Sequence, residues 1–148
     1  MKKAKRGEKG WKIIIASGPV IIENGKILLS KDAKDDFYKL PGGSVKLGKE
    51  SLEQGCKRRV KEEVNGNIEI IHPLDSHVLW KNPSTKEPMI IVLVNYLSKL
   101  KNKNQIKPGK GIVEIKWVSV KDIINGKFKK ASPNTIFTLK TMGKRKWK

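Results

Sequence analysis

Short apolar runs separated by turn signals extend along most of the chain, and this pattern predicts a protein rich in β-strands. Residues 11–16 and 19–22 contain many β-branched residues and are expected to form strands. Both residues of Asn24-Gly25 tolerate positive φ, so we expect a tight turn and a hairpin that continues through residues 26–30. Residues 89–97 are apolar without alternation, which is typical of a central strand buried on both faces. The remaining strands are predicted at residues 68–71, 76–80 and 112–118.

Residues 51–64 follow a helical period instead. Apolar residues recur there at every fourth position, which predicts a helix with a narrow apolar stripe of Leu52, Cys56, Val60 and Val64. Ser51 and Gln54 have the spacing of a capping box, so the helix should begin at Ser51. Asn65-Gly66 should end it, because both residues accept the left-handed conformation. Cys56 is expected to be a small core residue.

Two shorter helices are predicted near the end of the sequence. Ser119 should cap one that reaches residue 124, and Ser132-Pro133 has the form of an N-cap followed by proline, which predicts a helix to about residue 142. The order of three strands, one helix, four strands and two helices favours an α/β sandwich around a mixed sheet. A length of 148 residues suits one domain. We place it at residues 11–142, between basic tails at 1–10 and 143–148.

The chain carries a large positive charge. Thirty-three Lys and Arg residues against fourteen Asp and Glu residues give a formal net charge of +19. An excess of this size favours a polyanionic partner such as RNA or the ribosome. Lys144, Arg145 and Lys146 are the candidate nucleic-acid contacts. The alternative is that the basic ends are only solvated tails.

Composition excludes several other classes of protein. The single cysteine rules out an internal disulfide framework and a multi-cysteine zinc site. No run approaches the ~20 consecutive apolar residues of a membrane-spanning helix, so no membrane partner is expected. The basic start of the sequence lacks the apolar segment of a signal peptide, and a cytoplasmic location is therefore expected. Nothing in the pattern indicates the oligomeric state.

The segment from residue 40 to residue 66 carries the candidate chemistry. The pair Gly42-Gly43 gives a backbone that can bend sharply and approach a ligand closely. If this loop folds back along the following helix, the carboxylates of Glu50, Glu62 and Glu63 can converge on one hard cation. Mg²⁺ or Mn²⁺ takes oxygen ligands of this kind. An ordinary surface helix with charge pairs is the alternative, but it does not account for the glycine pair and Glu50.

This segment resembles the Nudix box, G-x5-E-x7-R-E-U-x-E-E-x-G-U, in which U is a bulky aliphatic residue. Gly43 matches the first glycine, Glu50 the first glutamate, Arg58 the arginine, and Glu62-Glu63 the paired glutamates. The hairpin before the box and a strand ending in Trp-Val-Ser after it extend the resemblance over most of the chain. The resemblance implies a Nudix-type α/β/α sandwich around a mixed β-sheet.

Three features depart from the family pattern. Six residues rather than five separate Gly43 from Glu50, and Asn65 stands at the position of a glycine. Arg59 stands where the family has a glutamate that binds metal or helps to deprotonate water. A permanent positive charge is thus expected near the cation. Arg59 either pairs with Glu63 and lowers metal affinity, or contacts a phosphate directly.

The resemblance also implies an activity, the hydrolysis of a nucleoside diphosphate linked to a further group, with Mg²⁺ or Mn²⁺ as cofactor. It assigns metal binding to Glu50, Glu62 and Glu63, and substrate binding to Gly42 and Gly43. The residues expected to take part in catalysis are Glu62, Glu63, Arg58 and Arg59, with Arg58 orienting the carboxylates.

A second hypothesis belongs to a different class. The chain would be a catalytically weakened Nudix-fold module that binds RNA or the ribosome through its basic surface. Arg59, the extra loop residue and the net charge of +19 all suit a polyanion. A nucleotide substrate and an RNA partner therefore both remain open at this point.

Overall fold

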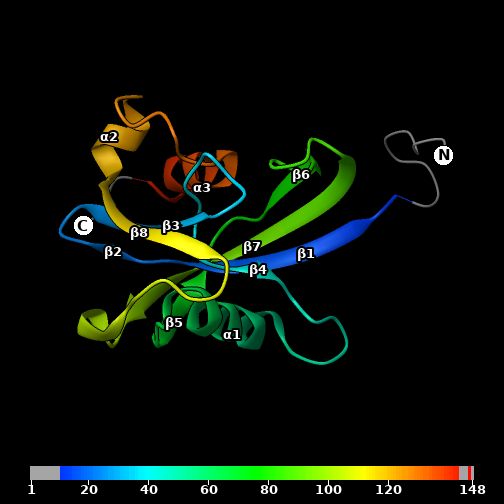
Figure 1. Ribbon diagram of the computed structural model, residues 1–148, viewed down its shortest axis with the longest axis horizontal. Helices are drawn as coiled ribbons and strands as arrows, with labels where there is room; N and C mark the ends of the chain where they lie inside the picture. The colour runs from blue at the N-terminus through cyan, green and yellow to red at the C-terminus, as the bar shows by residue number, and fades with distance from the viewer. Residues whose placement is uncertain (1–10, 144–146, 148) are drawn as a thin grey trace.

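Two β-sheets lie between helices in the computed structural model, which describes residues 11–143 and 147 (Figure 1). The five-stranded sheet has the order β4-β1-β7-β5, with β6 also paired to β7. Its members are β1 (Ile13–Val20), β4 (Gly43–Ser44), β5 (Ile68–Pro73), β6 (His77–Lys81) and β7 (Pro88–Leu100). The three-stranded antiparallel sheet contains β2 (Ile22–Glu23), β3 (Lys26–Asp32) and β8 (Ile112–Ser119).

The helices cover opposite sides of the sheets. The helix α1 (Leu52–Val64) lies on one side, and α2 (Val120–Ile124) and α3 (Pro133–Met142) lie on the other (Figure 1). The large sheet is mixed, because β1 runs parallel to β7 whereas its other pairings are antiparallel. The predicted α/β/α sandwich around a mixed sheet is therefore confirmed. No helix in the described part of the chain is long and apolar enough to cross a membrane.

The strand β3 separates two hydrophobic cores. Ile27 and Leu29 pack in the cluster that contains Leu139 of α3, whereas Leu28 packs in the cluster that contains Cys56 of α1. Alternate residues of a strand point to opposite faces, so both faces of β3 are buried. All of these side chains are fully buried, which confirms that Cys56 is a core residue.

The first strands differ from the prediction. Residues 11–16 and 19–22 were expected to form two strands, but β1 continues through Gly18-Pro19 to Val20. Its parallel pairing with β7 does not stop at these residues, since Gly18 lies opposite Asn95 and Pro19 opposite Tyr96. The long-range pairing with β7 thus overrides the local tendency of Gly18-Pro19 to interrupt a strand.

The strand β7 is central, as predicted, but it is not buried on both faces throughout. It pairs with β1 on one edge and with β5 and β6 on the other. Leu93 in its middle is only half-buried, because it lines a cleft. The two-residue strand β4 was not predicted, since its pairing with β1 depends on a long-range contact.

The predicted turn and helix ends are confirmed. The N-cap Ser51 accepts from the N–H of Gln54, and the Gln54 side chain accepts from the N–H of Ser51, as a capping box requires. The C-cap Asn65 has a φ of 57°, in the left-handed region. The hairpin turn has φ values of 52° at Asn24 and 74° at Gly25, and Ser132 caps α3.

A loop after β7 closes the end of α1. The N–H of Lys107 donates to the carbonyl of Val64 at 3.0 Å, and the N–H of Gly109 donates to the carbonyl of Glu63 at 2.7 Å. These carbonyls belong to the last turn of the helix, where backbone carbonyls have no hydrogen-bond partners within the helix itself. Gly109 lies so close that a side chain there would collide with the Glu62 carbonyl. The loop therefore fixes the helix end that carries Glu62 and Glu63.

The substitution Gly109→Ala should destabilise the fold, because the added methyl group has no room beside the Glu62 carbonyl. Overpacking of this kind costs about 1–3 kcal/mol, which urea denaturation can measure. Lys107→Ala, an exposed neighbour in the same loop, should change stability by less than about 0.5 kcal/mol. Equal stability of the two variants would contradict the tight contact.

Candidate functional site

The loop at Gly42-Gly43 is held between β1 and α1. In the β1–β4 pairing Gly43 lies opposite Ser17, and the N–H of Gly42 donates to Oε2 of Glu63 at 2.9 Å. Gly42 has a φ of 144°, and a side chain there would collide with the carbonyl of Ser17. Only glycine fits, and its N–H thereby reaches the carboxylate of α1.

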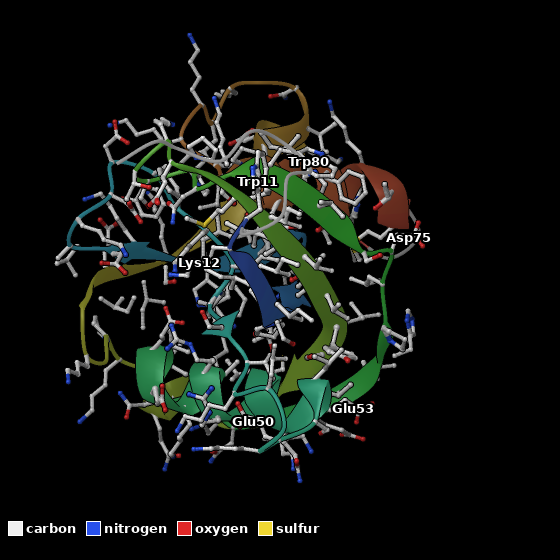
Figure 2. All side chains as sticks on the ribbon, turned by 90° about the vertical axis from the view of Figure 1, so that its right-hand side faces the viewer. Trp11, Lys12, Glu50, Glu53, Asp75 and Trp80 are labelled. Atoms are coloured by element: carbon white, nitrogen blue, oxygen red, sulfur yellow. The ribbon has the colours of Figure 1, made fainter. Side chains whose placement is uncertain are left out.

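Arg58 ties the start of this segment to its end. Its Nη2 lies 2.7 Å from Oε1 of Glu50, and its Nη1 lies 2.9 Å from Oε1 of Glu62. Nη2 also donates to the carbonyl of Ser44 at 3.1 Å. Glu50 lies beside the α1 layer, where Figure 2 labels it. Arg58 therefore bridges Glu50 and Glu62, and the orienting role that the resemblance implies stays a prediction.

Hydrogen bonds from Arg58 lower the pKa of Glu50 to about 2, assisted by the backbone N–H of Lys46. At neutral pH this carboxylate is ionised, and it accepts hydrogen bonds from Arg58 and from the Lys46 N–H. Glu50 thus acts as the counter-ion of an arginine that holds the loop against the helix.

The side chain of Glu63 is buried, with 4% of its surface exposed. Burial raises its pKa, and the nearby charges of Lys39 and Arg59 together with the Gly42 N–H oppose that rise. The closest atoms are Nη2 of Arg59 at 3.3 Å and Nζ of Lys39 at 3.9 Å. Glu63 is thus a carboxylate surrounded by groups that stabilise its negative charge.

The guanidinium of Arg59 lies against the backbone of Gly43, where any side chain would collide with it. Nη2 donates to Glu63 at 3.3 Å and to the carbonyl of Gly42 at 3.5 Å. Nη1 lies 3.6 Å from Oε2 of Glu62. Arg59 thus pairs with Glu63, and its effect on metal affinity and its contact with a phosphate stay predictions.

The three predicted metal ligands are only partly brought together. Glu62 and Glu63 both face the Arg59 guanidinium, whereas Glu50 is engaged by Arg58. Within residues 11–143 and 147, no group of three or more His, Cys, Asp or Glu residues could hold a metal ion. The ligand set therefore stays a prediction. Two carboxylates and one backbone carbonyl nevertheless fit Mg²⁺, which usually retains several waters and takes substrate phosphates.

Several residues near this site were missed by the sequence analysis. A pocket brings Asp32 and Lys110 together with Arg59, Glu62 and Glu63, and Lys39 lies beside Glu63. Asp32 ends β3, and Lys110 follows the loop that closes α1. In the sequence, Asp32 stands at the end of a predicted strand and Lys110 stands in a basic stretch. Their spacing along the chain, however, does not show that the fold places them next to Glu63.

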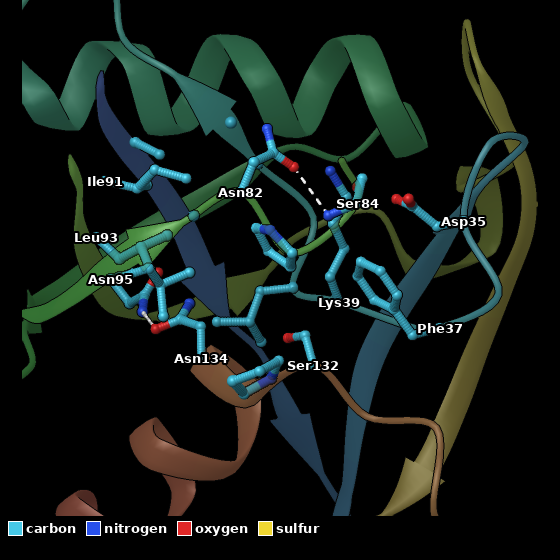
Figure 3. Close-up of a pocket in the computed structure, with 18 of the residues that line it drawn as sticks. Asp35, Phe37, Lys39, Asn82, Ser84, Ile91, Leu93, Asn95, Ser132 and Asn134 are labelled. Carbon is cyan, nitrogen blue, oxygen red and sulfur yellow. Dashed lines mark hydrogen bonds between the residues drawn. The ribbon is translucent and has the colours of Figure 1, made fainter. Parts of the chain in front are cut away.

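A cleft of about 200 Å³ opens beside Gly42-Gly43 (Figure 3). Asn95 and Asn134 lie at one end, joined by a hydrogen bond of 3.1 Å, and Phe37 and Asp35 lie at the other. Asp35 is buried, and its Oδ1 has no hydrogen-bond partner among the described residues. The cleft therefore offers an apolar wall together with amide and carboxylate groups.

Lys144, Arg145 and Lys146, the predicted nucleic-acid contacts, lie outside the described residues. The structure does describe Trp147, whose Nε1 donates to the carbonyl of Leu139 at 2.9 Å. The ring packs against the core cluster on the α3 side.

Comparisons with known proteins agree with this geometry. The sequence matches the NUDIX domain over residues 14–139. The structure is similar to a MutT NUDIX hydrolase from Burkholderia pseudomallei, with a TM-score of 0.74, 19% identity, and coverage of 89% of this chain and 99% of that chain. It is also similar to a NUDIX hydrolase from Nitrosomonas europaea, with a TM-score of 0.72, 20% identity and 88% of each chain covered. An Ap4A hydrolase from C. elegans has a TM-score of 0.66, 20% identity, and coverage of 87% and 94%.

The match to the NUDIX domain covers most of the chain, so this protein belongs to the Nudix family. The solved structures, at 19% to 20% identity, show the fold alone. A search of curated protein sequences found no match.

The lowered pKa of Glu50 predicts a specific titration behaviour. Its carboxyl group should titrate near pH 2 in the native protein, and Arg58→Gln should return the midpoint toward 4.5. Because the pKa is lower in the folded state, this pair stabilises the fold above about pH 4.5 and the contribution is lost as the pH falls toward 2. Carboxyl NMR measures the midpoint.

The exposed Lys57 provides the control for this titration. Lys57→Gln removes one charge from the same helix and should leave the Glu50 midpoint near pH 2. A midpoint near 4.5 in the unsubstituted protein would show that Arg58 does not hold Glu50 in solution.

Proposed function

We propose that this protein hydrolyses the diphosphate bond of a nucleoside diphosphate derivative with the help of a divalent metal ion. The observation that carries the proposal is the pairing of Glu63 with the glycine loop. A buried carboxylate accepts the N–H of Gly42 at 2.9 Å, and the same loop forms one wall of the cleft.

Glu62 and Glu63 would hold the metal, together with the carbonyl of Gly42. A bound divalent ion neutralises phosphate oxygens and lowers the pKa of a coordinated water. Both glutamates lie in the last turn of α1, where the helix dipole is negative. Two carboxylates at that position attract positive charge, which is why this helix end suits a metal ion.

The shape of the site indicates how a substrate would lie. Gly42-Gly43 borders the cleft and contacts both Glu63 and Arg59, so a diphosphate placed across the loop would reach them. A volume of about 200 Å³ is below the ~300–1,000 Å³ of sites for drug-sized ligands. The cleft thus suits one part of a nucleotide, and the diphosphate would lie outside it.

The alternative function, an RNA-binding or ribosome-binding module, rests on the net charge of +19 and on basic ends that lie mostly outside the described residues. No contact within residues 11–143 favours it over a nucleotide substrate. Family membership and the glutamate pair both favour a hydrolase, so that is the function we propose.

The proposal predicts loss of activity when either glutamate becomes an amide. A panel of nucleoside diphosphate derivatives with Mg²⁺ or Mn²⁺ should show turnover by the unsubstituted protein. Glu62→Gln and Glu63→Gln should lower kcat/KM by about 100-fold or more, since a catalytic metal contributes several kcal/mol and about 1.4 kcal/mol is a factor of ten.

The matched control is Glu53→Gln. Glu53 is an exposed residue in the first turn of α1, at the opposite end of the helix from Glu62 and Glu63 (Figure 2). It should retain full activity. If the unsubstituted protein turns over no substrate with either metal, the hydrolase proposal is wrong and the RNA-binding alternative gains weight.

A further inference from the structure

The guanidinium of Arg59 lies among the acceptors of this site, and it is loosely held. Its contacts with Glu63, the Gly42 carbonyl and Glu62 measure 3.3, 3.5 and 3.6 Å. Charge-assisted hydrogen bonds are usually about 2.7–2.9 Å long. The neighbouring Arg58 meets that standard, with contacts of 2.7 and 2.9 Å to its glutamates.

The donors of Arg59 are also incompletely used. Among the described residues both of its hydrogen bonds come from Nη2, whereas Nη1 has only the 3.6 Å ion pair with Glu62 and Nε is buried against Gly43 without a hydrogen-bond partner. A guanidinium has five N–H donors in a planar fork, which matches a phosphate group better than it matches separate oxygens. About 29% of the side chain is exposed, in the pocket that also contains Lys110. An anion can therefore reach it.

The acceptors around Arg59 are those that a divalent ion would use, two carboxylates and a carbonyl. Charges nearby are already balanced, because Lys39, Arg59 and Lys110 lie among Asp32, Glu62 and Glu63. A divalent ion added to this arrangement would meet carboxylates whose charge is already neutralised. The position that the ion would take is occupied by the guanidinium of Arg59. The attraction for the ion is reduced accordingly.

We propose that Arg59 is a built-in cation that bridges the α1 carboxylates and a diphosphate, so that this site binds diphosphates without a divalent ion. A divalent ion then binds only in competition with the guanidinium. The inference rests on the proposed function in one respect, that the ligand contains a diphosphate. Binding and hydrolysis consequently differ in their need for metal.

Inorganic pyrophosphate is the probe for the first test, by calorimetry in the presence of EDTA. The unsubstituted protein should bind it, and Arg59→Gln should bind it at least tenfold more weakly. Lys57→Gln, which removes a charge from an exposed position of the same helix, should bind within twofold of the unsubstituted protein. Absence of binding in EDTA, or equal binding by Arg59→Gln, would overturn the inference.

Manganese alone is the probe for the second test. Electron paramagnetic resonance should show that Arg59→Gln binds Mn²⁺ at least tenfold more tightly than the unsubstituted protein, because the competing guanidinium is gone. Lys57→Gln should not change Mn²⁺ affinity by more than twofold. Equal or weaker Mn²⁺ binding by Arg59→Gln would show that Arg59 does not occupy the cation position.

A conservative variant guards against misfolding of Arg59→Gln. Arg59→Lys keeps the charge and loses the planar fork, so pyrophosphate binding in EDTA should fall severalfold while the thermal transition stays that of the unsubstituted protein. Full affinity in Arg59→Lys would mean that charge alone, and no guanidinium bridge, binds the anion.

The two proposals fail separately. If the protein hydrolyses nucleotides with Mg²⁺ but does not bind pyrophosphate in EDTA, the proposed role of Arg59 is wrong and the proposed hydrolase activity is upheld. If it binds pyrophosphate in EDTA, loses that binding in Arg59→Gln, and turns over no substrate with metal, the proposed role of Arg59 is upheld and the proposed hydrolase activity is wrong.

Discussion

The buried carboxylate of Glu63 imposes the constraint on which the rest of the site depends. A negative charge with 4% of its residue surface exposed must be balanced by nearby donors. Those donors come from two segments: the Gly42 N–H and the Lys39 ammonium from the loop before α1, and the Arg59 guanidinium from α1 itself. The balance of this one charge therefore fixes the positions of the loop and of the helix end relative to each other.

Close backbone packing makes that balance possible. Gly42 approaches β1 so nearly that only glycine fits, and Gly109 approaches the carbonyl of Glu62 in the same way. The first contact brings an N–H to Glu63 from one side, and the second satisfies the helix carbonyls from the other. The last turn of α1 is thus held between two loops.

Local features of this fold could be predicted from the sequence, because they depend on neighbouring residues. The capping box at Ser51, the left-handed Asn65 and the Asn24-Gly25 turn are each determined within a few positions. The pairing of Arg58 with Glu62 follows in the same way from their separation of one helical turn.

Features that depend on distant contacts were not predicted. Continuation of β1 through Gly18-Pro19 results from its pairing with β7. In the site, Asp32 and Lys110 come from separate segments, and only the folded chain brings them beside Glu63. The convergence of Glu50 with the other carboxylates had been expected from sequence order, and in the structure Arg58 lies between Glu50 and Glu62 and pairs with both. Sequence spacing gives candidates for a site, and competition among oppositely charged partners decides which of them meet.

The contact between Gly43 and Arg59 has a consequence for how these positions can vary. The guanidinium covers the face of Gly43 on which a side chain would project. As long as residue 59 is arginine in this conformation, position 43 admits no larger residue. A shorter residue at position 59 would remove that restriction. A larger residue at position 43 would therefore displace the Arg59 guanidinium from the Gly42 carbonyl and from Glu63, so the size of a loop residue decides where a helix side chain can lie.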